Sequence, residues 1–242
     1  MKILVLDVGG TNLKALATGQ REPRKVASGP EMTARRMVAA ARKLTADWSY
    51  GGVSIGYPGT VLRGRPVAEP KNLGGGWVGF DFHRAFGKPV RLVNDAAMQA
   101  LGSYEGGRML FLGLGTGLGS ALVDDDVLEP MELAHLPYKK GRTYDDYVGL
   151  RGLERLGKKR WRQAVADVVD RLQTALGADY VVLGGGNAKL LQMLPKGARL
   201  GNNANAFRGG FLLWKDAVKR PGPRRRRKGA ARRTRRPRAR RK

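Results

Sequence analysis

The chain has 242 residues, 42% of them hydrophobic, so it can bury a sizeable core in one large domain or two small ones. It contains no cysteine, which excludes disulfides, thiolate zinc sites and cysteine nucleophiles. No apolar run reaches the roughly 18 residues that a membrane span needs, and we expect a cytoplasmic protein that begins directly with a strand.

The net charge of +26 is concentrated at one end of the chain. Residues 219–242 hold 15 of the 46 Lys and Arg residues and no acid, so residues 1–218, with 31 basic and 20 acidic residues, carry only +11. This segment has no aromatic residue and no apolar residue larger than alanine, so it cannot bury enough surface to offset the entropy of ordering. We predict that residues 219–242 form a disordered basic tail.

The first half of the chain alternates strand and helix patterns. Residues 2–8 predict a strand and 12–18 its antiparallel return, joined by a Gly9-Gly10-Thr11 turn of the kind that needs positive φ. Apolar residues at helical spacing predict a helix over 31–48. Further expectations are a strand at 51–59, a loop at 63–79, a short helix at 81–87 ending in glycine, a strand at 89–95 and a helix at 96–104.

The second half opens like the first, with two apolar runs around a glycine turn. Residues 108–125 predict a strand–turn–strand unit that turns at Gly115, Thr116 and Gly117. Later expectations are helices at 143–157 and 160–177, a strand at 179–186 and a helix at 187–194. Strands that alternate with helices, with a hairpin opening each half, indicate a mixed α/β fold.

Three strand ends carry glycine turns: Gly9-Gly10-Thr11, Gly115-Thr116-Gly117 and Gly184-Gly185-Gly186. Successive backbone N–H groups in such turns form concave anion sites, and glycine lets a phosphate approach closely. One such turn is more often structural, but three together favour a phosphate ligand. None matches GxxxxGK[ST] or a GxGxxG that opens a crossover helix, which argues against P-loop NTPases and Rossmann dehydrogenases.

The strand at 89–95 ends in Asn94 and Asp95. A carboxylate at the carboxyl end of a strand in an open α/β sheet faces the ligand crevice, and phosphoryl transfer to an alcohol needs a carboxylate that accepts the hydroxyl proton. The alternative is that Asp95 caps the following helix. The local pattern leaves both interpretations open.

Seven motifs occur in the order found in the ROK family of bacterial sugar kinases, over roughly residues 2–190: LDVGGTNLKAL, SIGYPG, KNLGGGW, LVNDAAMQALG, LGLGTGLGSAL, MELAH and VVLGGG. The chain resembles this family, and its short length and missing cysteine-rich zinc motif are most similar to the polyphosphate glucokinase branch. The resemblance implies a two-lobed, actin-like (ribonuclease H-like) ATPase fold of the ROK/hexokinase type. We expect one lobe at 1–105 and the other at 106–218.

The resemblance also implies roles for individual residues. Asp95 would be the general base on the 6-hydroxyl of glucose, and Asp7 would hold Mg²⁺ through water. The remaining assignments are phosphate binding by Gly9, Gly10, Thr11, Lys14, Gly115, Thr116 and Gly117; the far end of the donor at Gly184, Gly185 and Gly186; and sugar binding by Asn72, Asn94, Asp95, Glu132 and His135.

Two departures from the family pattern bear on the sugar side. The Glu-x-Gly-His motif reads Glu-Leu-Ala-His, so Ala134 stands where the family has glycine. No zinc is expected, and the segment LPYKKGRTYDDY after His135 must be held by packing. Trp77 lies close to Asn72 in sequence, and we expect it either in the core or at the edge of the sugar pocket.

The sequence therefore predicts a phosphotransferase that acts on glucose with polyphosphate or ATP as donor, and the family implies a homodimer. The alternatives are a sugar-binding ROK-type regulator or an inactive nucleic-acid-associated protein. Regulators of the family carry a helix-turn-helix before the DxGGT strand, which here begins at residue 2, so we favour the kinase. The tail could bind polyphosphate or nucleic acid by counter-ion release, or could simply be solvated.

Overall fold

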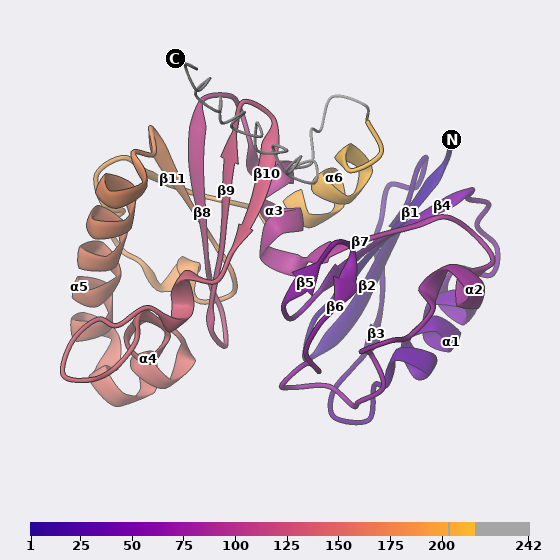
Figure 1. Ribbon diagram of the computed structural model, residues 1–242, viewed down its shortest axis with the longest axis horizontal. Coiled ribbons are helices and arrows are strands. Elements are labelled where there is room, and N and C mark those ends of the chain that lie inside the picture. Colours follow the sequence, from indigo (N-terminus) through magenta and orange to yellow (C-terminus); the bar gives the residue numbers. More distant parts are fainter. Residues whose placement is uncertain (203, 216–242) are drawn as a thin grey trace, which may run out of the picture.

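The molecule is built on two five-stranded sheets that have the same strand topology (Figure 1). The computed structural model describes residues 1–202 and 204–215, so the predicted tail at 219–242 lies outside the described residues. In the first sheet the order is β3-β2-β1-β4-β7, where β1 pairs antiparallel with β2 and parallel with β4. Its strands are β1 (Ile3–Val8), β2 (Asn12–Ala17), β3 (Arg24–Ala27), β4 (Gly52–Tyr57) and β7 (Val90–Asn94).

The second sheet repeats this arrangement in the order β10-β9-β8-β11-β12. β8, which is the first strand of this sheet along the chain, pairs antiparallel with β9 and parallel with β11. Its strands are β8 (Arg108–Leu114), β9 (Leu118–Asp124), β10 (Val127–Met131), β11 (Tyr180–Gly184) and β12 (Ala198–Leu200). Each half is therefore a hairpin extended by parallel strands, which confirms the predicted two-lobed α/β architecture.

Each sheet buries one face under a helix. Met37, Val38 and Ala41 of α1 (Ala34–Leu44) recur at helical spacing and join the core of the first sheet. Val165, Val168 and Leu172 of α5 (Leu150–Leu176) do the same for the second sheet. The shorter elements are α2 (Phe82–Phe86), α4 (Tyr144–Val148), the β5–β6 hairpin (Val61–Leu62 and Arg65–Pro66) and the 3₁₀ helices η1 (Leu133–His135) and η2 (Ala188–Leu190).

Two helices, α3 (Asp95–Ser103) and α6 (Asn205–Leu212), cross between the sheets (Figure 1). They meet at glycines: a Cβ on Gly102 would lie 1.9 Å from the Asn205 carbonyl oxygen, and one on Gly209 would lie 1.8 Å from that of Met98. Alanines of α3 join the apolar core of the second sheet, whereas Phe207 of α6 packs in a cluster with Ile3 and Val5 of β1. Each helix thus lies against the sheet of the other half, and the lobe boundary at 105/106 stays a prediction.

Several elements differ from the sequence expectations. The predicted helix at 187–194 is only the single turn η2, because the segment soon reaches Pro195, which disfavours helix in the residue before it. The predicted helix at 143–157 is interrupted at Gly149, where a Cβ would lie 2.8 Å from the Asp145 carbonyl oxygen. Within α5, Gly157 has φ 71°, so a kink does fall between the two predicted helices. β3, β10, β12 and α6 were not predicted.

Candidate active site

The carboxyl ends of three parallel strands bring Asp7 and Asp95 together. In the register of the first sheet Asp7 lies beside Gly56 of β4, and Gly56 lies beside Val93 of β7. A Cβ on Gly56 would lie 2.4 Å from the Met98 methyl group and 3.6 Å from Cα of Asp95. Glycine at this position therefore lets the first turn of α3 approach the sheet, and the two carboxylates share the edge where ligands bind in open α/β sheets.

The electrostatics of this pair set the proton affinity of Asp95. Burial raises the pKa of Asp95 to about 7, and the nearby negative charges of Asp7 and, more weakly, Glu132 act in the same direction. The Ala96 N–H opposes the shift, because it donates a 2.8 Å hydrogen bond to Asp95 Oδ1. Burial also raises the pKa of Asp7, against the attraction of Lys14, whose Nζ lies 3.4 Å from Asp7 Oδ2.

The residue that caps α3 is Asn94, the neighbour of Asp95. Asn94 is the N-cap of α3: its Oδ1 accepts a hydrogen bond from Ala97 N at 3.2 Å. Its Nδ2 donates to the Gly59 carbonyl oxygen at 3.0 Å, which anchors the loop after β4. Asn94, predicted to bind sugar, thus already has both ends of its amide engaged in fixing the start of α3.

The Gly9-Gly10-Thr11 turn is held by Ser28, the residue that follows β3. Ser28 donates from its Oγ to the Gly9 carbonyl oxygen at 2.5 Å and from its N to the Thr11 carbonyl oxygen at 2.9 Å. The expected positive φ is wrong for this turn, since neither glycine adopts it. Gly10 is needed for close approach instead, because a Cβ there would lie 3.1 Å from Cβ of Asn72.

The two later glycine turns form one packed unit. Asn187 donates from its N to the Leu114 carbonyl oxygen at 2.9 Å and from its Nδ2 to the Gly115 carbonyl oxygen at 3.0 Å. Gly185, with φ 82°, approaches so closely that a Cβ would lie 2.4 Å from the Leu114 oxygen. On the other side Asp145 accepts a 2.7 Å hydrogen bond from Leu118 N, and Leu150 N donates to the Thr116 oxygen at 3.1 Å.

These contacts hold the carbonyl groups of the turns and leave amide groups available. In the part of the chain that the structure describes, the N–H groups of Gly10, Thr11, Thr116 and Gly117 donate to no protein acceptor. Lys14 adds a cation beside the first turn. Free N–H groups of this kind in a glycine turn form a concave site that can bind a phosphate group.

Two of the predicted sugar residues, Glu132 and His135, come from the second half of the chain, and Glu132 lies close enough to Asp95 to affect its pKa. Thr60 Oγ1 donates to Glu132 Oε1 at 2.9 Å, and His135 Nε2 lies 4.0 Å from Glu132 Oε2. The His135 side chain is 65% exposed, so it is open to a ligand. Ala134 is buried in the core of the second half, so the extra methyl group is accommodated there.

Trp77 is a core residue. It is fully buried, donates from Nε1 to the Gly74 carbonyl oxygen at 2.6 Å and packs against the tilted ring of Tyr57, with ring centroids 5.3 Å apart. Of the two expectations for Trp77, the core position is the one that the structure has. The tryptophan anchors the loop that carries Asn72.

Sequence reasoning missed Ser28, Asp145 and Asn187, which hold the three turns in place. Ser28 follows a short edge strand that has no clear alternation, and Asp145 lies in a helical pattern. Asn187 directly follows the third glycine turn, and this adjacency was the only available signal for it.

Comparison with known proteins bears on this arrangement. No family model matches the sequence. A polyphosphate glucokinase of Mycobacterium tuberculosis (strain CDC 1551 / Oshkosh) is 25% identical over 203 residues, which cover 75% of this chain and 76% of the relative. The bifunctional enzyme NanE/NanK of Brucella melitensis biotype 1 is 30% identical over 138 residues, which cover 50% of this chain and 26% of the relative.

Solved structures agree with the sequence relatives. The inorganic polyphosphate/ATP-glucomannokinase from Arthrobacter sp. strain KM superposes with a TM-score of 0.75 at 21% identity, covering 88% of this chain and 97% of that one. A ROK family glucokinase from Streptomyces griseus, solved with glucose and AMPPNP, has a TM-score of 0.68 at 17% identity and coverages of 88% and 99%. This is the ROK fold. The predicted resemblance to ROK sugar kinases is confirmed, and the relatives together support a sugar kinase of the ROK type.

No helix within residues 1–202 and 204–215 is both long and apolar enough to span a membrane.

Proposed function

We propose that this protein transfers a phosphoryl group to the 6-hydroxyl of glucose, with polyphosphate or ATP as the donor. The observation that carries the proposal is the Asp95 carboxylate, whose pKa is raised to about 7 beside Asp7 and the first glycine turn. A base with a pKa close to neutral is matched to accepting a hydroxyl proton at physiological pH.

On the donor side the residues act by position and charge. The transition state of phosphoryl transfer spreads negative charge over the transferred group, so catalysis needs positioned donors more than covalent chemistry. The free N–H groups of Gly10 and Thr11, with Lys14 beside them, would contact the transferred phosphoryl group. Those of Thr116 and Gly117 would hold the next phosphate of the donor, and Gly184–Gly186 would border its far end.

The residues present fit Mg²⁺ as a partner of the donor. Within the described residues no group of three or more His, Asp or Glu side chains could hold a metal ion. Mg²⁺ is commonly bound by one or two carboxylates, waters and substrate phosphates, and Asp7, with 15% of its side chain exposed, supplies one such carboxylate. When bound, Mg²⁺ would neutralise charge on the phosphates; Lys14 and the turn amides contribute to the same end.

On the acceptor side Asp95 would accept the proton of the sugar hydroxyl. Asn72, Glu132 and His135 would hydrogen-bond the other hydroxyls, and Asn94 would use the second N–H of its Nδ2, since the first donates to Gly59. Hydrogen bonds of this kind discriminate between sugars far better than apolar contacts do. Because Asn72 and Asn94 belong to the first half and Glu132 and His135 to the second, a bound sugar would contact both halves. This supports closure of the halves around the sugar as part of the reaction.

The test is formation of glucose 6-phosphate from glucose and Mg²⁺, with ATP and long-chain polyphosphate supplied separately. We expect turnover with at least one donor and a loss in kcat of about 10²–10⁴-fold in Asp95→Asn, the usual contribution of a general base. Asp170→Asn is the matched control, because Asp170 is exposed on α5 and makes no hydrogen bond within the described residues. Mannose should be included as a second acceptor.

Three results would decide against parts of this proposal. Full activity in Asp95→Asn would remove Asp95 as the base. Turnover of mannose but not glucose would reassign the substrate. Absence of turnover with every donor and sugar, in a protein that still binds glucose, would favour the sugar-binding regulator. A homodimer remains a further expectation, which light scattering would test.

A further inference from the structure

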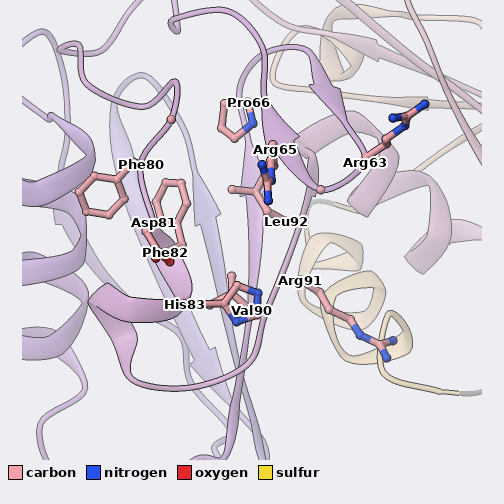
Figure 2. Close-up of a pocket in the computed structure, with 12 residues that line it drawn as sticks. Arg63, Arg65, Pro66, Phe80, Asp81, Phe82, His83, Val90, Arg91 and Leu92 are labelled. Atoms are coloured by element: carbon pink, nitrogen blue, oxygen red, sulfur yellow. The ribbon is translucent and has the colours of Figure 1, made fainter.

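A cavity of about 570 Å³ lies on the first half of the molecule (Figure 2). It is open to solvent and is bordered by the β5–β6 hairpin, residues 79–83 at the start of α2, and the first part of β7. None of the predicted site residues lines it. Leu92 is its last lining residue on β7, and Asp95 follows three residues later, about 10 Å along an extended chain. The cavity is thus a separate site on the strand that leads to Asp95.

The walls of the cavity are fixed by core packing. Phe82 and Leu92 are almost fully buried, and Pro66 is buried as well. Phe82 packs against Phe80, with ring centroids 4.8 Å apart, and against Trp77 at 6.2 Å. The cavity is therefore a preformed hollow with a stable apolar floor, within the 300–1,000 Å³ range typical of small-molecule sites.

The rim of the cavity is basic. Arg63, Arg65, Arg91 and His83 line it, against the single acid Asp81. Asp81 is already engaged, because its Oδ1 accepts a 2.9 Å hydrogen bond from Arg84 N at the start of α2. Three arginines against one carboxylate give the lining a net positive charge, which attracts an anion.

Of these four basic side chains, Arg65 and His83 can contact a ligand in the cavity, whereas Arg63 and Arg91 point elsewhere. Figure 2 shows Arg63 and Arg91 directed away from the other lining residues. Arg91 donates to the Leu213 carbonyl oxygen and lies over the Trp214 ring, 4.5 Å from its centroid. Arg65 lies beside Leu92, and His83 lies beside Val90 (Figure 2). Among the described residues, neither the Arg65 nor the His83 side chain has a hydrogen-bond or ion-pair partner.

We propose that this cavity binds a small phosphate-bearing anion through Arg65 and His83, at a site separate from the active site. The guanidinium group of Arg65 presents paired N–H donors that match two phosphate oxygens, and His83 adds a further donor. The apolar floor formed by Phe82, Leu92 and Pro66 can contact the uncharged part of a phosphate ester. The inference needs no assumption about the sugar or the donor of the kinase reaction.

The two histidines of the chain give a direct test, because one lies at each site. The ring resonances of His83 and His135 are followed by NMR while pyrophosphate is added without metal, and sodium chloride at matched ionic strength serves as the reference. Histidine-to-asparagine variants assign the two signals. We expect a saturable shift of the His83 signal that chloride does not produce.

The substitution Arg65→Gln then separates this site from the active site. It should weaken pyrophosphate binding at His83 by about tenfold or more while the response of His135 stays as in the unmodified protein. Arg35→Gln is the matched control, because Arg35 is exposed on α1 and does not line the cavity. The proposal is overturned if the His83 signal does not move, if chloride moves it equally, or if Arg65→Gln binds as tightly as the Arg35→Gln control.

Discussion

Asp95 combines burial with a neighbouring carboxylate, and both raise its pKa, to about 7. Only the ionised form accepts a proton, so we expect kcat/KM to rise about tenfold per pH unit below pH 7 and to level off above it. A pH profile of kcat/KM between pH 5.5 and 8.5 measures this. The profile should follow the same midpoint with either phosphoryl donor, because the proton comes from the sugar. A flat profile over this range would contradict the assignment of Asp95.

The raised pKa of Asp95 also means that ionisation of this carboxyl group destabilises the folded protein. The pKa of the carboxyl group is raised above its usual 3.8, so the folded protein holds the proton more tightly than the unfolded chain does. Stability is therefore lost as the pH rises from about 4 to 7, and the whole cost is present above pH 7. We expect Asp95→Asn to raise the Tm at pH 8, by about 2–4 °C for each ~1 kcal/mol regained, and to leave it nearly unchanged at pH 4.

Differential scanning calorimetry at the two pH values tests this, with Asp170→Asn as the control for losing one exposed carboxylate. An equal change in the Tm of Asp95→Asn at pH 4 and pH 8 would show that the effect does not come from ionisation of Asp95.

The adjacent glycines Gly185 and Gly186 of the third glycine turn differ in whether they tolerate a side chain. Gly185 has φ 82° and sits against the Leu114 backbone, whereas Gly186 has no atom within 4 Å of a Cβ and no positive φ. Strain of this kind costs about 1–3 kcal/mol, so Gly185→Ala should lower the Tm by roughly 2–10 °C. Gly186→Ala should leave the Tm unchanged. Thermal unfolding of both variants measures this, and equal Tm values would contradict the close packing of the turn on β8.

At the scale of elements, the loop after His135 is fastened to α5. The Tyr138 hydroxyl donates to Asp167, and Lys139 Nζ and Arg171 Nε lie 3.0 and 2.9 Å from the same carboxylate. The Tyr138 ring also packs against those of Tyr144 and Tyr147, with centroids 5.1 and 4.8 Å away. The sequence predicted that packing must hold this loop, and these contacts are the physical means.

Removing the charge at the centre of that cluster should loosen the loop. Tyr138 and the two cations hold the pKa of Asp167 at about 2, so the carboxylate is ionised at all working pH values. We expect Asp167→Asn to raise the KM for sugar several-fold, because His135 precedes the loop, with a smaller change in kcat. Steady-state kinetics measure the two constants separately. Asp170→Asn on the same helix is the control, and an unchanged KM for sugar would make the cluster purely structural.

The elements that the sequence predicted are those with strong local patterns. β1, β4, β8 and β11 are mostly apolar runs that are buried in the sheets, whereas β7 was found from its apolar residues between Pro89 and the polar pair Asn94-Asp95. The C-terminal glycine expected for the helix at 81–87 is the left-handed Gly87. β3 was missed because it is an exposed edge strand without hydrophobic alternation. The helix predicted at 187–194 is only the single turn η2, because so short a helix is marginal and Pro195 follows it directly. α6 is made by contact with α3 and β1, which no local window contains.

In the candidate site, too, the residues at strand ends could be predicted from local patterns, whereas the residues that act through long-range contacts could not. Asp7, Asp95 and the glycine turns stand at strand ends, so their proximity follows from the parallel pairing of the strands. The groups that hold the turns, such as Asp145 and Asn187, act through hydrogen bonds across 27 and 72 residues. Such contacts depend on the packing of the whole second half, so residue type and spacing alone could not reveal them.

For the whole molecule, the crossing of α3 and α6 places the proposed base at the junction of the two sheets. Asp95 is the first residue of α3, and α3 packs on the second sheet although it follows the last strand of the first. Ser54 of β4 donates to the Gly210 carbonyl oxygen at 2.6 Å and accepts from Trp214 Nε1 at 2.7 Å, which fastens the end of the described chain to the first sheet. A relative rotation of the halves would therefore act directly on α3 and the position of Asp95.

The charge of the whole chain leads to the last prediction. Residues 219–242 carry 15 basic residues and no acid, and long-chain polyphosphate is a linear polyanion. If these residues attract the donor, a chain that ends at Val218 should show a several-fold higher KM for long-chain polyphosphate at low salt. Screening should remove the difference at about 0.5 M salt, where the Debye length falls to a few ångströms.

Two controls separate attraction of the donor from damage to the enzyme. The KM for glucose should not change on truncation, because Asn72, Asn94, Glu132 and His135 all precede residue 218. A polyphosphate of only a few phosphates should also show little change, because it offers few charges beyond those bound at the turns. An unchanged KM for the long chain at low salt would leave the tail without a part in donor capture, and nucleic acid would then be the polyanion to test by the salt dependence of binding.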